Sequence, residues 1–183
     1  MKKIVSLLLQ CSMLAGCLLL AGCQTTPTRP SLQPVAKVDL PRFMGDWYVI
    51  AHIPTFLEKG AYNAVESYQL QADGTIATTF TFNQDAPDGP LKTYQPKGFV
   101  RNTSSNAEWG MQFVWPVKAD YVIVYLDPEY QQTIVAREQR DYVWIMARTP
   151  EISAADYQAL TERVRNMGYE MNLLRRVPQQ RRP

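Results

Sequence analysis

The apolar residues between Pro41 and Arg148 mostly recur at every second position. The stretch EWGMQFVW (108–115) alternates apolar with polar or small residues, and TIATTFTF (75–82) does so with threonines mostly on its second face. A period of two is that of a β-strand with one buried face. We therefore expect this part of the chain to form a β-sheet whose strands each have an apolar face to bury.

Turn-forming residues divide this region into successive strands. Asp73-Gly74 suits a tight hairpin, and DAPDGP (85–90) suits a loop between the third and fourth strands. No helices alternate with the strands, so the sheet is expected to be antiparallel. The expected strands are 47–53, 64–70, 75–82, 93–101, 107–115, 119–126, 131–137 and 142–148.

One helix is expected after the strands. Ser153, with Asp156 three residues later, signals a helix start, and Gly168 signals its end. A short strand over 172–175 can close the chain. An all-β chain with one C-terminal helix folds as a closed barrel or as a sandwich. An eight-stranded up-and-down barrel has room for one small ligand, and the aromatic inward faces suit such a cavity as well as a sandwich core.

The first residues have the pattern of an export signal. Lys2 and Lys3 precede an uncharged, mostly apolar run, 4–20, and small residues stand before a cysteine. This pattern is that of a secretory signal peptide, here residues 1–22. The run is long enough to be weighed as a transmembrane helix, but no basic cluster follows it, so the signal peptide is favoured.

Leu-Ala-Gly-Cys occurs twice, ending at Cys17 and at Cys23. The motif resembles the lipobox of bacterial lipoproteins, whose cysteine is lipidated and becomes the mature N-terminus. Three leucines follow Cys17, whereas a polar segment follows Cys23, so Cys23 is the expected lipidation site. In that family an Asp after the cysteine retains the protein at the inner membrane. Gln24 here implies the periplasmic face of the outer membrane, with a lipid anchor.

Cysteine positions and charge limit the possible functions. The chain has three cysteines, all at or before Cys23, so the mature protein is expected to have no disulfide, thiol nucleophile or cysteine metal ligand. Lys and Arg total 19 and Asp and Glu 17. Cleavage before Cys23 removes two lysines and makes the formal balance zero, which gives no indication of nucleic-acid binding.

The two ends of the mature chain differ from its middle. Residues 23–38, with prolines among Thr, Ser and Gln, are expected to be a lipidated N-terminus and flexible linker. The barrel domain is expected over 39–176. The remaining segment, 177–183, is expected to be a solvated basic tail, with contact to anionic head groups as the alternative.

Three further motifs occur in order among the expected strands. GDWY (45–48) opens the first strand, LDPEY (126–130) lies between two strands, and WIMARTP (144–150) ends the eighth. With the lipobox and the single late helix, they make 39–176 similar to the lipocalin family, specifically to its bacterial outer-membrane lipoprotein branch. The resemblance implies an eight-stranded antiparallel up-and-down β-barrel and favours this fold over a sandwich.

The resemblance assigns structural roles to the motif residues. It implies that Trp47 fills the closed base of the barrel and that the Arg148 guanidinium lies on its indole in a cation–π contact. Gly45 leaves the chain room to turn into the base. Asp127 and Tyr130 belong to a turn at the same end. Many family members tie the C-terminal segment to the barrel with a disulfide, which this mature chain cannot form.

The resemblance also implies a function, namely a cup that stores or carries lysophospholipid or fatty acid for envelope maintenance. Strand parity extends the inward face from Trp47 to Ala51 and Ile53. Glu66 shares the face of Tyr68, but we expect it outward and solvated because a buried, unpaired carboxylate is costly; contact with a head group is the alternative. The expected ligand contacts are Tyr68, Phe80, Trp109, Phe113 and Trp144.

An enzymatic function is not expected. His52 is the only histidine and points away from the cavity by parity, and a catalytic triad needs a base beside its nucleophile. No cofactor or metal site is predicted. The alternatives to a lipid carrier are a binder of another small hydrophobic ligand and a structural accessory that docks on an envelope protein. Self-association into a homodimer is compatible with the sequence.

Overall fold

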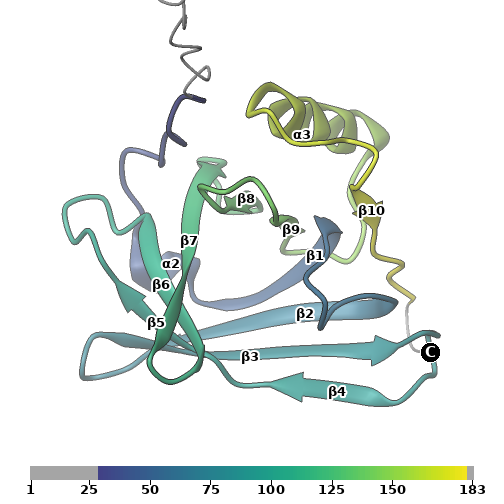
Figure 1. Ribbon diagram of the computed structural model, residues 1–183, viewed down its shortest axis with the longest axis horizontal. Coiled ribbons are helices and arrows are strands. Elements are labelled where there is room, and N and C mark those ends of the chain that lie inside the picture. The colour runs from purple at the N-terminus through teal and green to yellow at the C-terminus, as the bar shows by residue number, and fades with distance from the viewer. Residues whose placement is uncertain (1–28, 181–183) are drawn as a thin grey trace, which may run out of the picture. The chain divides into compact units, whose positions relative to one another are not determined.

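The computed structural model describes residues 29–180, and residues 31–180 form an antiparallel β-barrel (Figure 1). Neighbouring strands pair in the order β10-β1-β2-β3-β5-β6-β7-β8-β9, and β9 pairs back with β1 to close the barrel. The strands are β1 Gly45–Ile53, β2 Ala61–Leu70, β3 Thr75–Gln84, β4 Leu91–Tyr94, β5 Lys97–Val100, β6 Glu108–Val114, β7 Val117–Leu126, β8 Gln132–Ala136, β9 Val143–Ala147 and β10 Arg175–Arg176.

The fourth strand of the barrel is interrupted. We expected one strand over 93–101, but β4 and β5 are separate and both pair with β3. Gln95 and Pro96 lie between them, and a proline has no N–H to donate to a sheet ladder. Since β4 and β5 together fill one strand position, the closed eight-stranded barrel is confirmed.

Within residues 29–180, two helices flank the strands. The short helix α2, Leu40–Phe43, precedes β1 and was not expected. The helix α3, Ala154–Asn166, begins as expected after Ser153, whose hydroxyl accepts a hydrogen bond from the Asp156 N–H at 3.0 Å. It lies against the outside of the barrel, next to β9 (Figure 1). Within residues 29–180 no helix is both long and apolar enough to span a bilayer.

A β-bulge in β1 divides the hydrophobic residues of this strand between two cores. The pairing register with β9 shifts between Val49 and Ala51. Val49 therefore packs inside the barrel, whereas Ala51 and Ile53 pack in the outer cluster beneath α3. The expectation that Ala51 and Ile53 face inward was wrong, because a bulge adds one residue and reverses the parity that follows it.

Both ends of the described chain pack on the barrel more closely than a linker and a solvated tail would. Val38 is fully buried, and its N–H donates to the Ser105 carbonyl at 2.7 Å. Val177 is also buried, and its N–H donates to the Ile50 carbonyl at 3.0 Å. The barrel domain therefore extends beyond both expected boundaries. The expected signal peptide and Cys23 lie outside the described residues.

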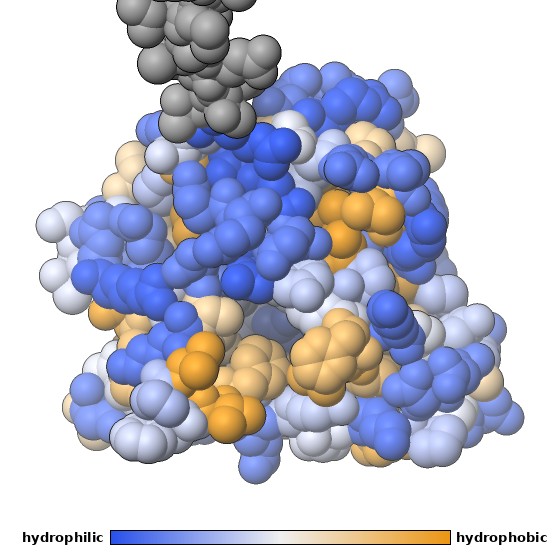
Figure 2. Space-filling view, in the orientation of Figure 1, coloured by the Kyte–Doolittle hydropathy of each residue, from blue (hydrophilic) through white to orange (hydrophobic). Residues whose placement is uncertain are grey.

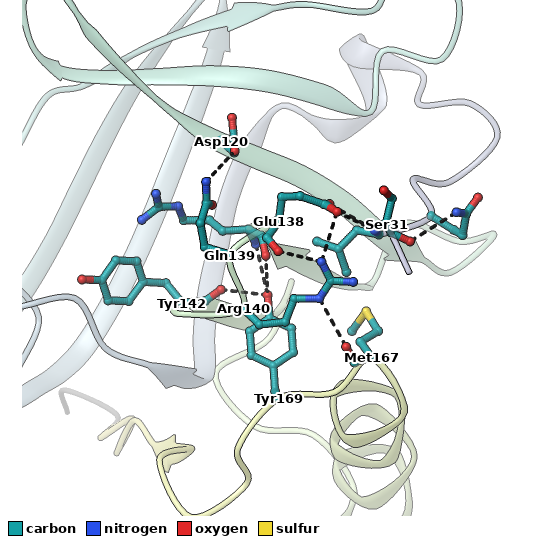
Figure 3. A network of polar contacts seen from close by, with 11 residues as sticks. Ser31, Asp120, Glu138, Gln139, Arg140, Tyr142, Met167 and Tyr169 are labelled. Carbon is teal, nitrogen blue, oxygen red and sulfur yellow. Dashed lines mark hydrogen bonds and ion pairs between the residues drawn. The ribbon is translucent and has the colours of Figure 1, made fainter. Parts of the chain in front are cut away.

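A polar network joins the N-terminal segment to the β8–β9 turn and the end of α3 (Figure 3). The Leu32 N–H donates to the Glu138 carboxylate at 3.0 Å. Arg140 forms an ion pair with Glu138 at 3.2 Å and donates to the Met167 carbonyl at 3.3 Å. The Tyr169 hydroxyl donates to the Tyr142 carbonyl at 3.0 Å. These contacts fix the turn that carries one side of the cavity wall.

Candidate functional site: an apolar cup above an aromatic floor

The closed base of the barrel is built around Trp47 and Arg148. Trp47 is fully buried, and its indole N–H donates to the Phe43 carbonyl at 2.8 Å. The Arg148 guanidinium lies over the indole, 3.9 Å from the ring centroid. The same guanidinium donates to the carbonyls of Asp46, Arg42, Phe43 and Met44 at 2.8–3.1 Å. One side chain thus satisfies the carbonyl groups that end α2 and stacks on the base tryptophan.

The other motif residues form turns beside this stack. Gly45 has φ +91°, and a Cβ there would lie 3.5 Å from a guanidinium nitrogen of Arg148. Between β7 and β8, the Asp127 carboxylate accepts a hydrogen bond from the Gln132 N–H at 2.5 Å. The Tyr130 hydroxyl accepts one from the Asp39 N–H at 2.9 Å. The motif residues therefore gather at the base, and none of them lines the cavity.

An aromatic layer covers the base on its inner side. Trp109 stacks on Tyr121, with ring centroids 5.1 Å apart, and meets Tyr68 edge-on at 5.8 Å. Phe43 packs against both Tyr68 and Trp109. Tyr68 and Trp109, two of the expected ligand contacts, therefore lie in this packed layer and not among the residues that line the cavity.

Above the aromatic layer lies a cavity of about 590 Å³. Three of the expected ligand contacts, Phe80, Phe113 and Trp144, lie on its wall. Met111 and Tyr142, which were not among the expected ligand contacts, also lie on the wall. Pockets that take one small ligand are of this size and are mostly apolar with a few placed polar groups.

The mouth of the cavity is unusually apolar. Phe56 and Val114 line it and are 78% and 72% exposed, and Trp115, which follows Val114 in the chain, is 82% exposed. Figure 2 shows apolar side chains gathered beside a hollow in the lower half of this face, where Figure 1 places the β6–β7 turn. Exposed apolar patches on soluble domains commonly mark interaction or ligand-entry sites.

Glu58, which follows β1, is a cavity residue that the sequence did not indicate. Its carboxylate accepts a hydrogen bond from the Trp144 indole N–H at 2.9 Å and one from the Thr55 hydroxyl at 2.8 Å. His52 Nδ1 lies 2.9 Å from the same carboxylate. His52 was expected to point away from the cavity, and this was wrong because the β1 bulge reverses its parity.

Glu66, on β2, was expected outward and solvated, and this was also wrong. It is buried, lines the cavity and accepts a hydrogen bond from the Tyr68 hydroxyl. The hydroxyls of Tyr68 and Tyr121 lie 2.5 Å apart. Burial, and secondarily the nearby Glu58 carboxylate, raise the pKa of Glu66 to about 8. Glu66 is therefore a neutral carboxylic acid at pH 7, which explains how the fold tolerates it.

Known proteins with similar sequences support the same architecture. A family model described as a lipocalin-like domain matches residues 38–179. The outer membrane lipoprotein Blc of Citrobacter freundii is 31% identical over 153 residues, which cover 82% of this chain and 85% of that protein. Temperature-induced lipocalin-1 of Arabidopsis thaliana is 29% identical over 161 residues, covering 83% and 85%.

Solved structures show the same fold at lower identity. Insecticyanin from the tobacco hornworm Manduca sexta superposes with a TM-score of 0.63 at 13% identity, covering 81% of this chain and 84% of that one. Lobster apocrustacyanin A1 superposes with a TM-score of 0.60 at 14% identity, covering 85% and 94%. At these identities the likeness concerns the fold alone.

Proposed function

This chain belongs to the lipocalin family, and we propose that its barrel stores or carries a lysophospholipid or fatty acid for maintenance of a bacterial envelope. The observation that carries the proposal is the cavity of about 590 Å³, with its apolar wall and apolar mouth. A single acyl chain is a suitable ligand for this cavity, because burying each methylene against the apolar wall contributes about 0.8 kcal/mol.

The proposal includes a membrane anchor at Cys23. Its support is the lipobox sequence and the polar segment that follows Cys23, together with the similarity to bacterial outer membrane lipoproteins. Gln24 fits the periplasmic face of the outer membrane. Nine chain steps separate Cys23 from Leu32, where packing on the barrel begins, and span at most about 32 Å. The cup would therefore stay close to its source of lipid.

Processing of cysteine variants tests the anchor. Cys23→Ser should leave the protein unprocessed or release it from the membrane fraction, because the acylated thiol is lost. Cys17→Ser should still fractionate with membranes as a mature lipoprotein, measured by metabolic labelling with palmitate. Loss of labelling in the Cys17 variant alone would show that Cys17 carries the anchor and that the assignment to Cys23 is wrong.

Isolation of the protein from its own envelope tests the carrier function. Native mass spectrometry should show a bound single-chain lipid, which extraction and mass analysis then identify. An empty barrel in a stable complex with another envelope protein would instead favour the accessory function. A bound apolar molecule other than a lipid would support a binding function but overturn the assignment of a lipid as the ligand.

Titration of the purified protein gives a second test. Trp144 lies on the cavity wall, so an acyl chain that enters should change its fluorescence, whereas the buried Trp47 should change little. Lysophospholipid or fatty acid should bind saturably to the wild type, and Trp144→Phe should give a smaller spectral change or a weaker affinity. If no single-chain lipid binds saturably to the wild type, the carrier proposal fails.

A further inference from the structure

The innermost part of the cavity is polar, although its wall and mouth are mostly apolar. Glu66 on β2, Thr78 on β3 and Tyr121 on β7 all contribute to the lining, and each is at least nine-tenths buried. They adjoin the aromatic layer, because Tyr121 stacks on Trp109. We call Glu66, Thr78 and Tyr121 the polar floor of the cup.

The hydrogen bonds of the polar floor leave some of its capacity unused. The Tyr68 hydroxyl donates to one carboxyl oxygen of Glu66, so the Tyr121 hydroxyl donates to Tyr68 in turn. These two hydrogen bonds use both tyrosine hydroxyl protons and a single oxygen of Glu66. Within residues 29–180 the buried Thr78 hydroxyl has no hydrogen-bond partner. A buried polar group without a partner costs about 1–3 kcal/mol, so its persistence in a cavity calls for a ligand or a water molecule.

The geometry of the sheet brings these groups together. Thr78 pairs directly with Tyr68 across β2 and β3, and Phe80 pairs with Glu66. Thr78 and Glu66 are therefore diagonal neighbours on the inner face, with backbones about 7–8 Å apart. A ligand atom between their side chains can contact both of them.

The charge state of the floor limits what such a ligand can be. Glu66 is protonated at neutral pH because burial raises its pKa to about 8, so it offers an O–H donor to the cavity. The Glu58 carboxylate lies nearby on the cavity wall. An anion at the floor would be repelled by Glu58. A cation would lose its water with a neutral acid in return, because the Glu58 carboxylate is already bonded to His52, Thr55 and Trp144. An uncharged oxygen group meets neither penalty.

We propose that Glu66 and Thr78 form a hydrogen-bonding subsite at the cavity floor for the uncharged oxygen end of a single-chain lipid, such as an alcohol, an ester carbonyl or a protonated fatty acid. The proposal rests on the lipid-carrier function and adds a direction to it. The oxygen end lies at the floor, and the acyl chain extends along Phe80 and Met111 toward the apolar mouth. A lysophospholipid has a permanently charged head group, so it binds with that head at the mouth and leaves the subsite unused.

Affinities for matched ligands test the subsite. The probes are 1-dodecanol and a lysophospholipid with a twelve-carbon acyl chain, and affinity is measured by displacement of a fluorescent fatty-acid analogue. Thr78→Val keeps the shape of the side chain but removes its hydroxyl. It should weaken dodecanol binding about threefold to tenfold, the effect of one hydrogen bond, and should leave lysophospholipid binding unchanged. Glu66→Met should have the same selective effect, whereas Glu66→Gln keeps a donor and should bind dodecanol nearly as well as the wild type.

The matched control is Thr79→Val, because Thr79 is the neighbouring threonine and is not among the cavity-lining residues. This variant should bind both probes as the wild type does. Equal dodecanol affinity in wild type, Thr78→Val and Glu66→Met would overturn the subsite. A parallel loss of lysophospholipid affinity would also overturn it, since that pattern indicates a distorted cavity. If the wild type binds lysophospholipid but not dodecanol, the subsite fails and the carrier function stands; if it binds neither, both fail.

The orientation of the bound ligand provides a direct measurement on the wild-type protein. A crystal structure with 12-bromo-1-dodecanol locates the bromine by its anomalous scattering. Bromine near Phe113 at the mouth is the expected result, because the hydroxyl then lies at the floor. Bromine beside Glu66 and Thr78 would overturn the proposal.

Discussion

The two ends of this barrel use aromatic residues in opposite ways. At the base, Trp47 is fully buried, its N–H is bonded and its face is covered by the Arg148 guanidinium. At the mouth, Phe56 and Trp115 are 78% and 82% exposed. The sequence contains the same residue types at both ends. Their surroundings decide whether the aromatic area is packed into the fold or remains exposed.

This difference separates stability from function along the barrel axis. The base satisfies its own polar groups and needs no ligand, as the hydrogen bonds of Arg148 show. The cup instead contains a neutral buried acid, an unpartnered hydroxyl and exposed apolar side chains. Features that cost folding free energy are common at functional sites. Substitutions at the two ends should therefore affect different measurements.

The largest expected effect is at the base. Trp47→Ala removes a fully buried indole and the surface on which Arg148 stacks. Truncation of a buried Trp costs about 3–5 kcal/mol, a large share of the roughly 5–15 kcal/mol that stabilises a typical domain. Urea unfolding followed by circular dichroism measures the loss. A change below about 1 kcal/mol would mean that the base is not the stable end.

The second effect concerns the polar floor and depends on pH. The pKa of Glu66 is about 8 in the folded protein, against 4.5 for the ordinary group. Between these values the unfolded chain loses its proton while the folded protein keeps it, so the free energy of unfolding decreases as pH rises from 4.5 to 8. One pKa unit corresponds to about 1.4 kcal/mol, so the decrease is on the order of a few kcal/mol.

Glu66→Gln removes this titration. The variant should be more stable than the wild type at pH 9, and the difference should vanish near pH 4, measured by urea unfolding at each pH. Glu129→Gln changes an exposed glutamate on the β7–β8 turn and serves as the control. Parallel stability profiles of Glu66→Gln and wild type would contradict a buried neutral acid.

A smaller effect is expected for Arg148→Lys. Lysine keeps the charge but loses the planar stack on Trp47 and most of the donors that reach the α2 carbonyls. We expect a loss of about 1.5–3 kcal/mol, the range for hydrogen bonds to charged groups. In a double-mutant cycle with Trp47→Phe, the two positions should couple by at least about 0.5 kcal/mol. Additive effects would show that the guanidinium–indole contact contributes nothing.

The sequence predicted the base better than the cup, for a physical reason. The base motifs are local. Strand period and helix caps identified all eight wall strands, although not the break between β4 and β5, and the start of α3. Period two gives the face of a residue but not its height along the barrel, so Tyr68 and Trp109 were assigned to the cavity although they lie below it. A single bulge in β1, which no glycine or proline signals, moved His52 to the opposite face of the strand from the one expected.

Buried polar groups were the hardest to predict. The Tyr68 hydroxyl that donates to Glu66 lies 2.5 Å from that of Tyr121, 53 residues away in the chain, and the carboxylate that helps to raise the pKa of Glu66 stands in the β1–β2 connection. Such partners meet only in the folded barrel. Burying an ionised, unpaired carboxylate is costly; protonation and the hydrogen bond from Tyr68 lower that cost here, and the remainder appears as the raised pKa of Glu66. An acidic residue on the apolar face of a strand was the one available signal.

The smallest effect on stability is expected at the mouth, where Trp115→Ser should change the free energy of unfolding by less than about 0.5 kcal/mol because the indole is exposed. Trp115 is not a lining residue, so the equilibrium affinity for lysophospholipid should also stay the same. The rate of uptake from vesicles should fall severalfold, because the exposed apolar rim shortens the aqueous path of a lipid between bilayer and cup. Stopped-flow transfer of a fluorescent lysophospholipid measures this rate.

Leu91→Ser is the matched control, since Leu91 is 61% exposed and does not line the cavity. Equal transfer rates for the two variants would mean that lipid does not enter across Trp115, and the contrast between a stabilising base and a lipid-exchanging mouth would then rest on Phe56 and Val114 alone.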